Sequence, residues 1–270
     1  MIRLDVYLAQ TGLAGSREQA KAMILQGLVH VNGKIVEKPS FLIDETQTPL
    51  IKAEKAIPYV GRGGLKLEGA LKAFDVDPAG FTALDVGAST GGFTDCLLQR
   101  GAKRIFALDA GHDQLDKTLK KDPRVVSMEG QNAREMTPAL FGGVKMDLIV
   151  MDVSFISATY LLPLFHSLLG EDGIALVLVK PQFEVGKAMI GKKGIVKDPA
   201  AHFSALKKVV DSGLLSGLSV CGACVSPIFG GDGNKEFFAY FKKEKAPCSH
   251  ITDAELHKLV FEKERRDLSC

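Results

Sequence analysis

The chain has 270 residues, of which 46% are apolar and 24% are charged, a composition that excludes the disordered and fibrous classes. Its 34 basic and 32 acidic residues give a net charge of +2, so bulk charge alone does not indicate a nucleic-acid-binding protein. No apolar leader or membrane-spanning run is visible, and the five cysteines lack the spacing of a disulfide framework. We therefore expect reduced thiols and a cytoplasmic protein that does not contact membranes.

Residues 1–60 predict a small α+β domain followed by a linker. A short amphipathic helix is followed by a second one, which begins after Ser16, and the glutamine three residues later is typical of a capping box. Asn32-Gly33 stands between two apolar segments and predicts a tight hairpin turn, because both residues accept a positive φ. The polar stretch 44–64 indicates a connector, and a helix is expected after it.

From about residue 81 the chain alternates apolar strands with helical segments, which predicts an α/β domain around a parallel sheet. The expected strands are 83–86, 104–108, 125–128, 147–151, 174–179, 218–225 and 236–241. Because only a short glycine-rich segment separates the last two strands, we expect them to pair antiparallel. A parallel sheet with a reversed last strand resembles the Rossmann-like class I methyltransferase fold. Residues 61–245 would form this domain, and residues 246–270 a helical tail.

A glycine-rich turn links the first of these strands to a helix, as in cofactor-binding α/β domains. Its spacing, G-x-x-x-G-G, departs from the G-x-G-x-x-G of dinucleotide folds, and the carboxylate of Asp85 would repel a pyrophosphate. A cofactor with a sulfonium and an amino group but no phosphate suits this carboxylate better, so we expect S-adenosylmethionine. The expected cofactor residues are Asp85, Gly87, Ser89, Gly91, Gly92, Phe93, Asp109, Asn132 and Asp152. Asp109 would bind the ribose hydroxyls, whereas Asn132 fits either the adenine edge or a surface loop.

Four charged residues are expected at the carboxyl edge of the sheet, namely Lys66, Asp152, Lys180 and Glu236. Asp152 and Lys180 end the fourth and fifth strands, Glu236 begins the reversed strand, and Lys66 lies in the first turn of the helix that precedes the sheet. Such a group suits the removal of a proton from a weak acid, for example a ribose 2′-hydroxyl, with Lys180 as the base and the carboxylates orienting both ammonium groups. The alternative is a set of unrelated surface charges.

Several motifs resemble known families. Residues 3–5, 16–17 and 27–34 resemble the RNA-binding fold of small-subunit ribosomal protein four, here called S-four. Residues 61–67, 84–94, 179–184 and 226–228 resemble the TlyA family, whose catalytic half is similar to FtsJ-type ribose methyltransferases. The resemblance covers about residues 1–243 and implies 2′-O-methylation of cytidine in ribosomal RNA, free or in ribosomal subunits. It also implies that Lys66, Asp152, Lys180 and Glu236 form a catalytic tetrad.

The distribution of basic residues indicates where RNA would be held. Residues 1–66 contain nine basic and six acidic residues, a local excess of three positive charges. The expected RNA contacts are Arg3, Arg17, Lys21, Lys34, Arg62, Lys192 and Lys193. The last two lie in the loop 186–197, which we expect to overhang the active site as a mobile substrate loop. A solvated helix face is the alternative for the residues of the N-terminal domain.

Two other functional classes are alternatives to a methyltransferase. A non-catalytic RNA-binding protein would not need the four charged residues at the sheet edge, and a secreted cytolysin, the class suggested by the haemolysin label of many family members, would need a leader or a membrane-active segment. No metal is expected, because Cys221 and Cys224 have no second pair and residues three apart on a strand face opposite sides.

Overall fold

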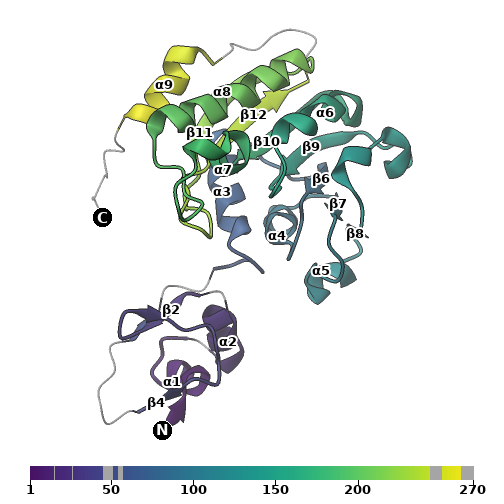
Figure 1. The fold of residues 1–270 in the computed structure, drawn as a ribbon. Coiled ribbons are helices and arrows are strands. Elements are labelled where there is room, and N and C mark those ends of the chain that lie inside the picture. Colours follow the sequence, from purple (N-terminus) through teal and green to yellow (C-terminus); the bar gives the residue numbers. More distant parts are fainter. Residues whose placement is uncertain (15, 26, 45–50, 54–56, 244–250, 263–270) are drawn as a thin grey trace. The chain divides into compact units, whose positions relative to one another are not determined.

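The structure is a computed structural model that describes residues 1–14, 16–25, 27–44, 51–53, 57–243 and 251–262. It divides into two compact units, Met1–Arg62 and Gly63–Cys270. Figure 1 shows a small unit of short helices and strands and a larger unit in which helices cover a sheet. Each unit has a hydrophobic core of its own.

The first unit packs two helices against short strands. Its elements are β1 (Ile2–Arg3), α1 (Leu4–Gln10), α2 (Arg17–Leu25), β2 (Val29–Val31), β3 (Lys34–Ile35), β4 (Leu42–Ile43) and β5 (Ile51–Ala53). The expected hairpin turn is confirmed, since Asn32 has φ 51° and Gly33 has φ 79° between β2 and β3. Leu4, Leu8 and Ile24 are fully buried and hold the helices together.

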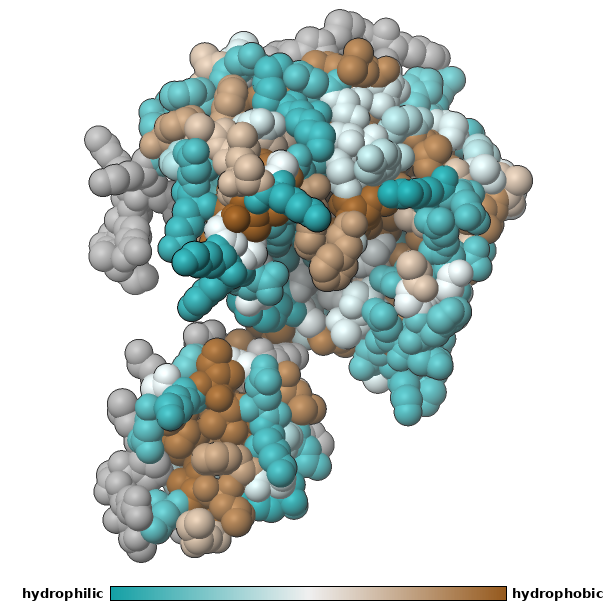
Figure 2. Space-filling model, in the orientation of Figure 1, coloured by the Kyte–Doolittle hydropathy of each residue, from teal (hydrophilic) through white to brown (hydrophobic). Residues whose placement is uncertain are grey.

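The stretch expected as a connector contains a strand. β5 pairs antiparallel with β2 and completes a three-stranded sheet in the order β3-β2-β5. Its three residues are too few to show an alternating pattern, so only the pairing with β2 reveals the strand. On the face of the small unit that Figure 2 shows, an apolar stripe runs between hydrophilic margins. The exposed large apolar side chains of this unit are Met1, Leu13, Leu25, Ile35, Phe41 and Leu42.

The larger unit is built on a seven-stranded sheet with the order β11-β12-β10-β9-β6-β7-β8. The strands are β6 (Thr82–Val86), β7 (Arg104–Asp109), β8 (Val125–Glu129), β9 (Met146–Met151), β10 (Leu169–Val179), β11 (Ser219–Val225) and β12 (Phe237–Lys242). All seven expected strands are present, and β12 is antiparallel to both of its neighbours, as predicted. Because Phe237 pairs with Val179, the start of β12 lies beside the end of β10.

Helices cover both faces of this sheet. They are α3 (Gly63–Ala73), α4 (Gly92–Gln99), α5 (Lys117–Lys121), α6 (Leu162–Leu168), α7 (Pro181–Glu184), α8 (Pro199–Leu215) and α9 (Asp253–Phe261), with short 3₁₀ turns η2 (Ala133–Glu135), η3 (Pro138–Phe141), η4 (Ala158–Tyr160) and η5 (Lys187–Met189). Phe237 and Phe241 of β12 enter the core shared with α6, α8 and α9. Phe238, on the opposite face, stacks on Phe93 of α4 with ring centroids 6.2 Å apart. The alternation along β12 therefore serves two helical layers.

The cysteines differ from the expectation in one respect. Cys221 on β11 is disulfide-bonded, so the expectation of reduced thiols is wrong for this residue. Cys96, buried on α4, and Cys224 carry thiols, and burial raises the pKa of the Cys224 thiol to about 12. Among the described helices, none combines the length and the apolar character needed to cross a bilayer.

Candidate active site

The glycine-rich turn between β6 and α4 has a backbone that only small or flexible residues tolerate. Gly87 has φ 87°, Ser89 has φ 48° and Gly91 has φ 97°. A Cβ on Gly87 would lie 2.5 Å from the carbonyl oxygen of Asp152, and a Cβ on Gly91 would collide with the Leu119 side chain. The sequence argument that these glycines admit a ligand is therefore incomplete, since the packing of the chain itself also requires them.

A cavity of about 210 Å³ opens above this turn. Its lining consists of Gly63, Gly87, Ala88, Ser89, Thr90, Gly92, Phe93, Asp152, Ser154 and Lys180. Five of the residues expected to bind the cofactor (Gly87, Ser89, Gly92, Phe93 and Asp152) thus line one cavity together with the expected base. Gly91 is the N-cap of α4, with no side chain to cap the helix.

Asp85 lies on β6, two residues before the turn, and is completely buried. The hydroxyl of Thr94 donates to its Oδ2 over 2.7 Å, whereas its Oδ1 has no hydrogen-bond partner among the described residues. Burial raises the pKa of the Asp85 carboxyl to about 7, and the negative charges of Asp152 and Asp109 add to this effect. The group is therefore a buried acid with an unsatisfied oxygen.

Two other expected cofactor residues stand at the same edge without lining the cavity. Asp109 ends β7, where its Oδ2 accepts the Ser89 N–H over 2.8 Å and its Oδ1 accepts the Gly111 N–H over 2.7 Å. Asp109 thus fastens the glycine-rich turn to the loop after β7. Asn132 is the exposed N-cap of η2 and accepts the Arg134 N–H over 3.0 Å, which gives it a local structural role.

The four expected catalytic residues lie together. Lys180 Nζ is 2.5 Å from Asp152 Oδ1, and Lys66 Nζ is 3.8 Å from Asp152 Oδ2 and 2.7 Å from Glu236 Oε2. Asp152 thus lies between the two ammonium groups, and Glu236 pairs with the second one. The Glu236 side chain is only 2% exposed, and burial raises the pKa of its carboxyl while Lys66 opposes that shift.

Sequence reasoning missed two residues that shape this group. The hydroxyl of Ser154 accepts a hydrogen bond from Lys180 Nζ over 2.9 Å, and Ser154 follows Asp152 by only two positions. Gly230 lies against Glu236, because a Cβ there would be 2.6 Å from Oε1. The position of Ser154 just beyond a strand end was a usable signal, whereas the contact of Gly230 depends on the fold of the loop before β12.

The basic residues expected to bind RNA fall into two local arrangements. In the small unit, Arg3 Nε and Arg17 Nε lie 2.9 and 3.1 Å from the two carboxylate oxygens of Asp5, which is fully buried. Hydrogen bonding to Arg3 holds the pKa of Asp5 below its usual value. Two guanidinium groups share one carboxylate, so a positive charge remains. Lys21, Lys34 and Arg62 are exposed.

In the larger unit, Lys192 and Lys193 are exposed on a tight turn that the Gly191 N–H closes by donating to the Ile195 carbonyl over 3.0 Å. The turn is also fastened at its far end. The buried amide of Asn234 accepts the Val196 N–H over 2.9 Å and donates to the Gly194 carbonyl over 3.1 Å. Asn234 thus fastens the end of the loop at residues 194–196, and the mobility of the loop stays a prediction.

Comparisons with known proteins show the family to which the chain belongs. A family model described as FtsJ-like methyltransferase matches residues 59–243, and one described as S4 domain matches residues 2–48. "Putative rRNA methyltransferase YqxC" of Bacillus subtilis is 46% identical over 238 residues, 88% of this chain and 84% of that protein. "16S/23S rRNA (cytidine-2'-O)-methyltransferase TlyA" of Mycobacterium tuberculosis is 41% identical over 242 residues, 90% of each chain. A solved structure, "Putative hemolysin from Streptococcus thermophilus", has a TM-score of 0.76 at 40% identity and covers 96% of this chain and 94% of that one.

The fold and the grouped residues define a methyltransferase of the Rossmann-like class, preceded by an S4 domain. The chain belongs to the FtsJ-like methyltransferases and, within them, to the TlyA family that the sequence motifs predicted. Among the described residues, no group of three or more His, Cys, Asp or Glu side chains is arranged to hold a metal ion.

Proposed function

We propose that this chain transfers a methyl group from S-adenosylmethionine to the 2′-oxygen of cytidine ribose in ribosomal RNA. The observation that carries the proposal is the meeting of Lys66, Asp152, Lys180 and Glu236 beside the cavity over the glycine-rich turn. The printed name of the Mycobacterium tuberculosis relative supports cytidine and ribosomal RNA as the substrate class. The S4 domain supports an RNA partner.

The acidic side chains around the glycine-rich turn fit this cofactor. Asp85, Asp109 and Asp152 surround the turn with carboxylates, an environment that opposes phosphate groups and favours a cation. The unpartnered Oδ1 of Asp85 suits an ammonium or water donor. We infer that Asp109 holds the ribose hydroxyls, and that the turn residues Gly87, Ser89, Gly92 and Phe93 shape the rest of the site.

The reaction divides into binding and proton removal. When bound, S-adenosylmethionine supplies an electrophilic methyl group. Lys180, once it has released a proton to solvent, accepts the proton of the 2′-hydroxyl at Nζ, so that the ribose oxygen becomes the nucleophile. Asp152 and Ser154 orient Nζ and stabilise the ammonium that results. Lys66, which pairs with Glu236, also contacts Asp152 and so helps to hold that carboxylate in place. Alignment of the hydroxyl with the methyl carbon provides the remaining part of the rate enhancement.

A labelled-methyl assay tests the proposal. The purified full chain is incubated with labelled S-adenosylmethionine and with either free ribosomal RNA or ribosomal subunits from cells that lack this protein. We expect label in the RNA, and mass spectrometry of the nucleosides should show 2′-O-methylcytidine. Label on a base, or no transfer to RNA in either form, would contradict the proposal.

The pH dependence of cofactor binding tests the role of Asp85. Because its pKa is about 7 in the free protein, a cation that needs the ionised form should bind more tightly as the pH rises through 7, with proton release below that pH. The fraction ionised changes roughly tenfold between one pH unit below and one above 7, so a change in Kd of about that size is expected. Without the cation, the stability of the fold decreases as the pH rises from the pKa of Asp85 in the unfolded chain, 3.8, toward 7. In this range the folded protein retains a proton that the unfolded chain has lost.

Isothermal titration calorimetry in buffers of different ionisation enthalpy measures both the Kd and the proton release. Asp85→Asn should remove the pH step. Asp147→Asn is the matched control, since Asp147 lies at the other end of the sheet, where it accepts the Thr82 N–H over 2.8 Å. Equal pH profiles for all three proteins would refute the role of Asp85.

A further inference from the structure

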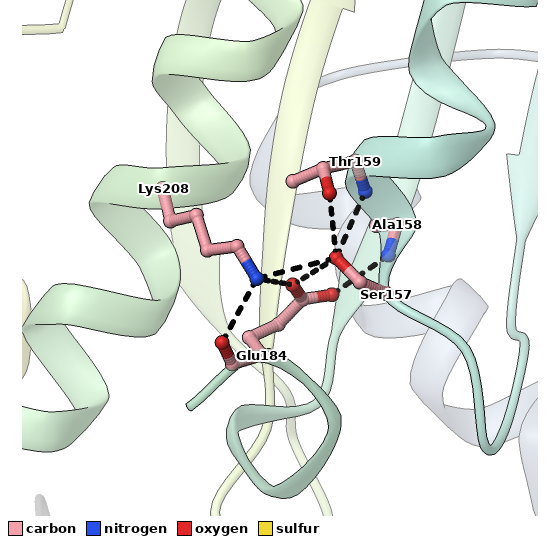
Figure 3. A network of polar contacts seen from close by, with 5 residues as sticks. All are labelled: Ser157, Ala158, Thr159, Glu184 and Lys208. Atoms are coloured by element: carbon pink, nitrogen blue, oxygen red, sulfur yellow. Dashed lines mark hydrogen bonds and ion pairs between the residues drawn. The ribbon is translucent and has the colours of Figure 1, made fainter. Parts of the chain in front are cut away.

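A buried carboxylate follows Lys180 by four residues and has none of the roles described above. Glu184 is the last residue of α7, and its side chain is only 2% exposed. Its Oε2 accepts the hydroxyl of Ser157 over 2.5 Å, and its Oε1 accepts the backbone N–H of Ala158 over 2.7 Å (Figure 3). Both partners belong to a different loop, the one that follows β9.

Lys208 of α8 completes the network. Its Nζ donates to the backbone carbonyl of Glu184 over 2.9 Å and lies 3.3 Å from Oε2 (Figure 3). A buried carboxylate is stable only when its charge is paired and its oxygens accept hydrogen bonds, and both conditions are met here. Removing either partner is therefore expected to disturb the others.

The network joins the two segments that carry the expected base and its partners. Lys180 stands immediately before α7, whereas Asp152 and Ser154 stand in the loop that leads to Ser157. The two segments contact each other at two places. Lys180 contacts Asp152 and Ser154. Glu184, four residues later, contacts Ser157 and Ala158.

The segment between these two connections is strained. Phe155 has φ +65°, a left-handed conformation that is unfavourable for a residue with a Cβ. Its ring lies 5.2 Å from that of Phe183 between centroids and is otherwise exposed to solvent. Such a backbone persists only where its surroundings hold it, and the hydrogen bonds of Glu184 anchor the loop two residues further on.

We propose that Glu184 is a positioning residue, which sets the distance of Lys180 Nζ from Asp152 and Ser154 by fastening the loop after β9 to α7. The proposal rests on the proposed function, because its kinetic test measures methyl transfer. In the described part of the chain, Glu184 neither lines the cavity nor forms an ion pair with any of the four charged residues, so its effect is transmitted through Ser157, Ala158 and the backbone of α7.

The variant Glu184→Gln tests the idea most directly. The glutamine carbonyl can still accept the Ala158 N–H, but its amide nitrogen cannot accept from Ser157 and faces the ammonium of Lys208. We expect kcat to fall roughly ten- to a hundredfold, as small displacements at a reacting centre do. The KM for RNA and the Kd for S-adenosylmethionine should stay within about twofold of the original values, because the glycine-rich turn, Asp85 and Asp109 lie outside the Glu184 network.

Three further variants keep the test decisive if Glu184→Gln does not fold. Ser157→Ala removes the hydroxyl that donates to Glu184, together with its hydrogen bonds to Thr159, without changing charge, and Lys208→Met removes the paired cation. Lys207→Met is the matched control, because Lys207 is the neighbour of Lys208 on α8 but pairs with Asp211 and Asp253, away from both loops. We expect Ser157→Ala and Lys208→Met to lower kcat at saturating substrate, and Lys207→Met to leave it unchanged.

Hydrogen exchange supplies a readout that does not depend on activity. The amide of Ala158 should exchange faster in Glu184→Gln, where a neutral carbonyl is a weaker acceptor than the carboxylate, and in Ser157→Ala, where the loop loses one anchor, than in Lys207→Met, while amides of the sheet keep their protection. A Glu184→Gln or Ser157→Ala protein with unchanged kcat would overturn the proposal, as would a loss of kcat matched by an equal loss of cofactor binding. If the unmodified chain itself transfers no methyl group to RNA, the proposed function fails instead, and unchanged Ala158 exchange would independently refute the fastening role.

Discussion

Lys180→Ala is expected to lower the rate of methyl transfer about 10²–10⁴-fold, the usual contribution of a positioned general base. The substitution removes Nζ, which contacts Asp152 and Ser154, and with it the proposed acceptor of the 2′-hydroxyl proton. The glycine-rich turn and Asp85 are untouched, so the affinity for S-adenosylmethionine should change little. Single-turnover transfer of a labelled methyl group gives the rate, and calorimetry gives the affinity.

Lys180→Arg separates proton transfer from ion pairing. A guanidinium group can still pair with Asp152, but it does not lose its proton in proteins. If Lys180 is the base, the arginine variant should be nearly as slow as the alanine variant. Substantial activity in Lys180→Arg would indicate that a positive charge is sufficient at this position, and full activity in Lys180→Ala would remove the residue from the mechanism.

Gly91→Ala is expected to destabilise the larger unit by roughly 2–6 kcal/mol, from backbone strain together with steric overlap. Gly91 has φ 97°, and an added Cβ would collide with Leu119 and come within 2.8 Å of Leu115. Because these leucines lie on and just before α5, relief would require that segment to move away from the turn. The same shift would close or distort the cavity, so cofactor binding should be lost as well.

Gly142→Ala is the control for Gly91→Ala. Gly142 also has a positive φ, 64°, but nothing lies within 4 Å of an added Cβ. It should therefore show only the strain of a left-handed residue, about 1–2 kcal/mol. Urea denaturation of both variants, with and without S-adenosylmethionine, measures the difference. Equal losses of stability would show that Leu119 and Leu115 yield easily and that packing does not require Gly91.

The parts of the fold that follow from local pattern were predicted correctly. The strands could be predicted because buried parallel strands are continuous apolar runs, and the turn at Asn32-Gly33 because its residue types fit its φ angles. Asp152 and Lys180 could be placed together, since parallel strands end at a common edge. Placing Glu236 beside Lys66 required the additional inference that the last strand is reversed.

The parts that depend on contacts between distant segments could not be predicted. Glu184 looks like an ordinary helix-end acid in the sequence, and only the meeting of α7 with the loop before η4 shows that it is buried and shared. Asp5 likewise gives no sign in sequence that it pairs with Arg17, twelve positions away. The position of Asn132 after a strand predicted either a contact with the adenine edge or a surface loop, and its role as the N-cap of η2 required the backbone geometry.

The position of β12 between β10 and β11 has a consequence for folding during synthesis on the ribosome. Glu236 immediately precedes β12, so a nascent polypeptide that has emerged only through β11 carries two lysines and one acid of the group but lacks the last carboxylate. Nearly the whole larger unit must be synthesised before β12 can pair with β10 and β11. We therefore expect that a chain that has emerged only through β11 transfers no methyl group to the RNA of the ribosome that makes it.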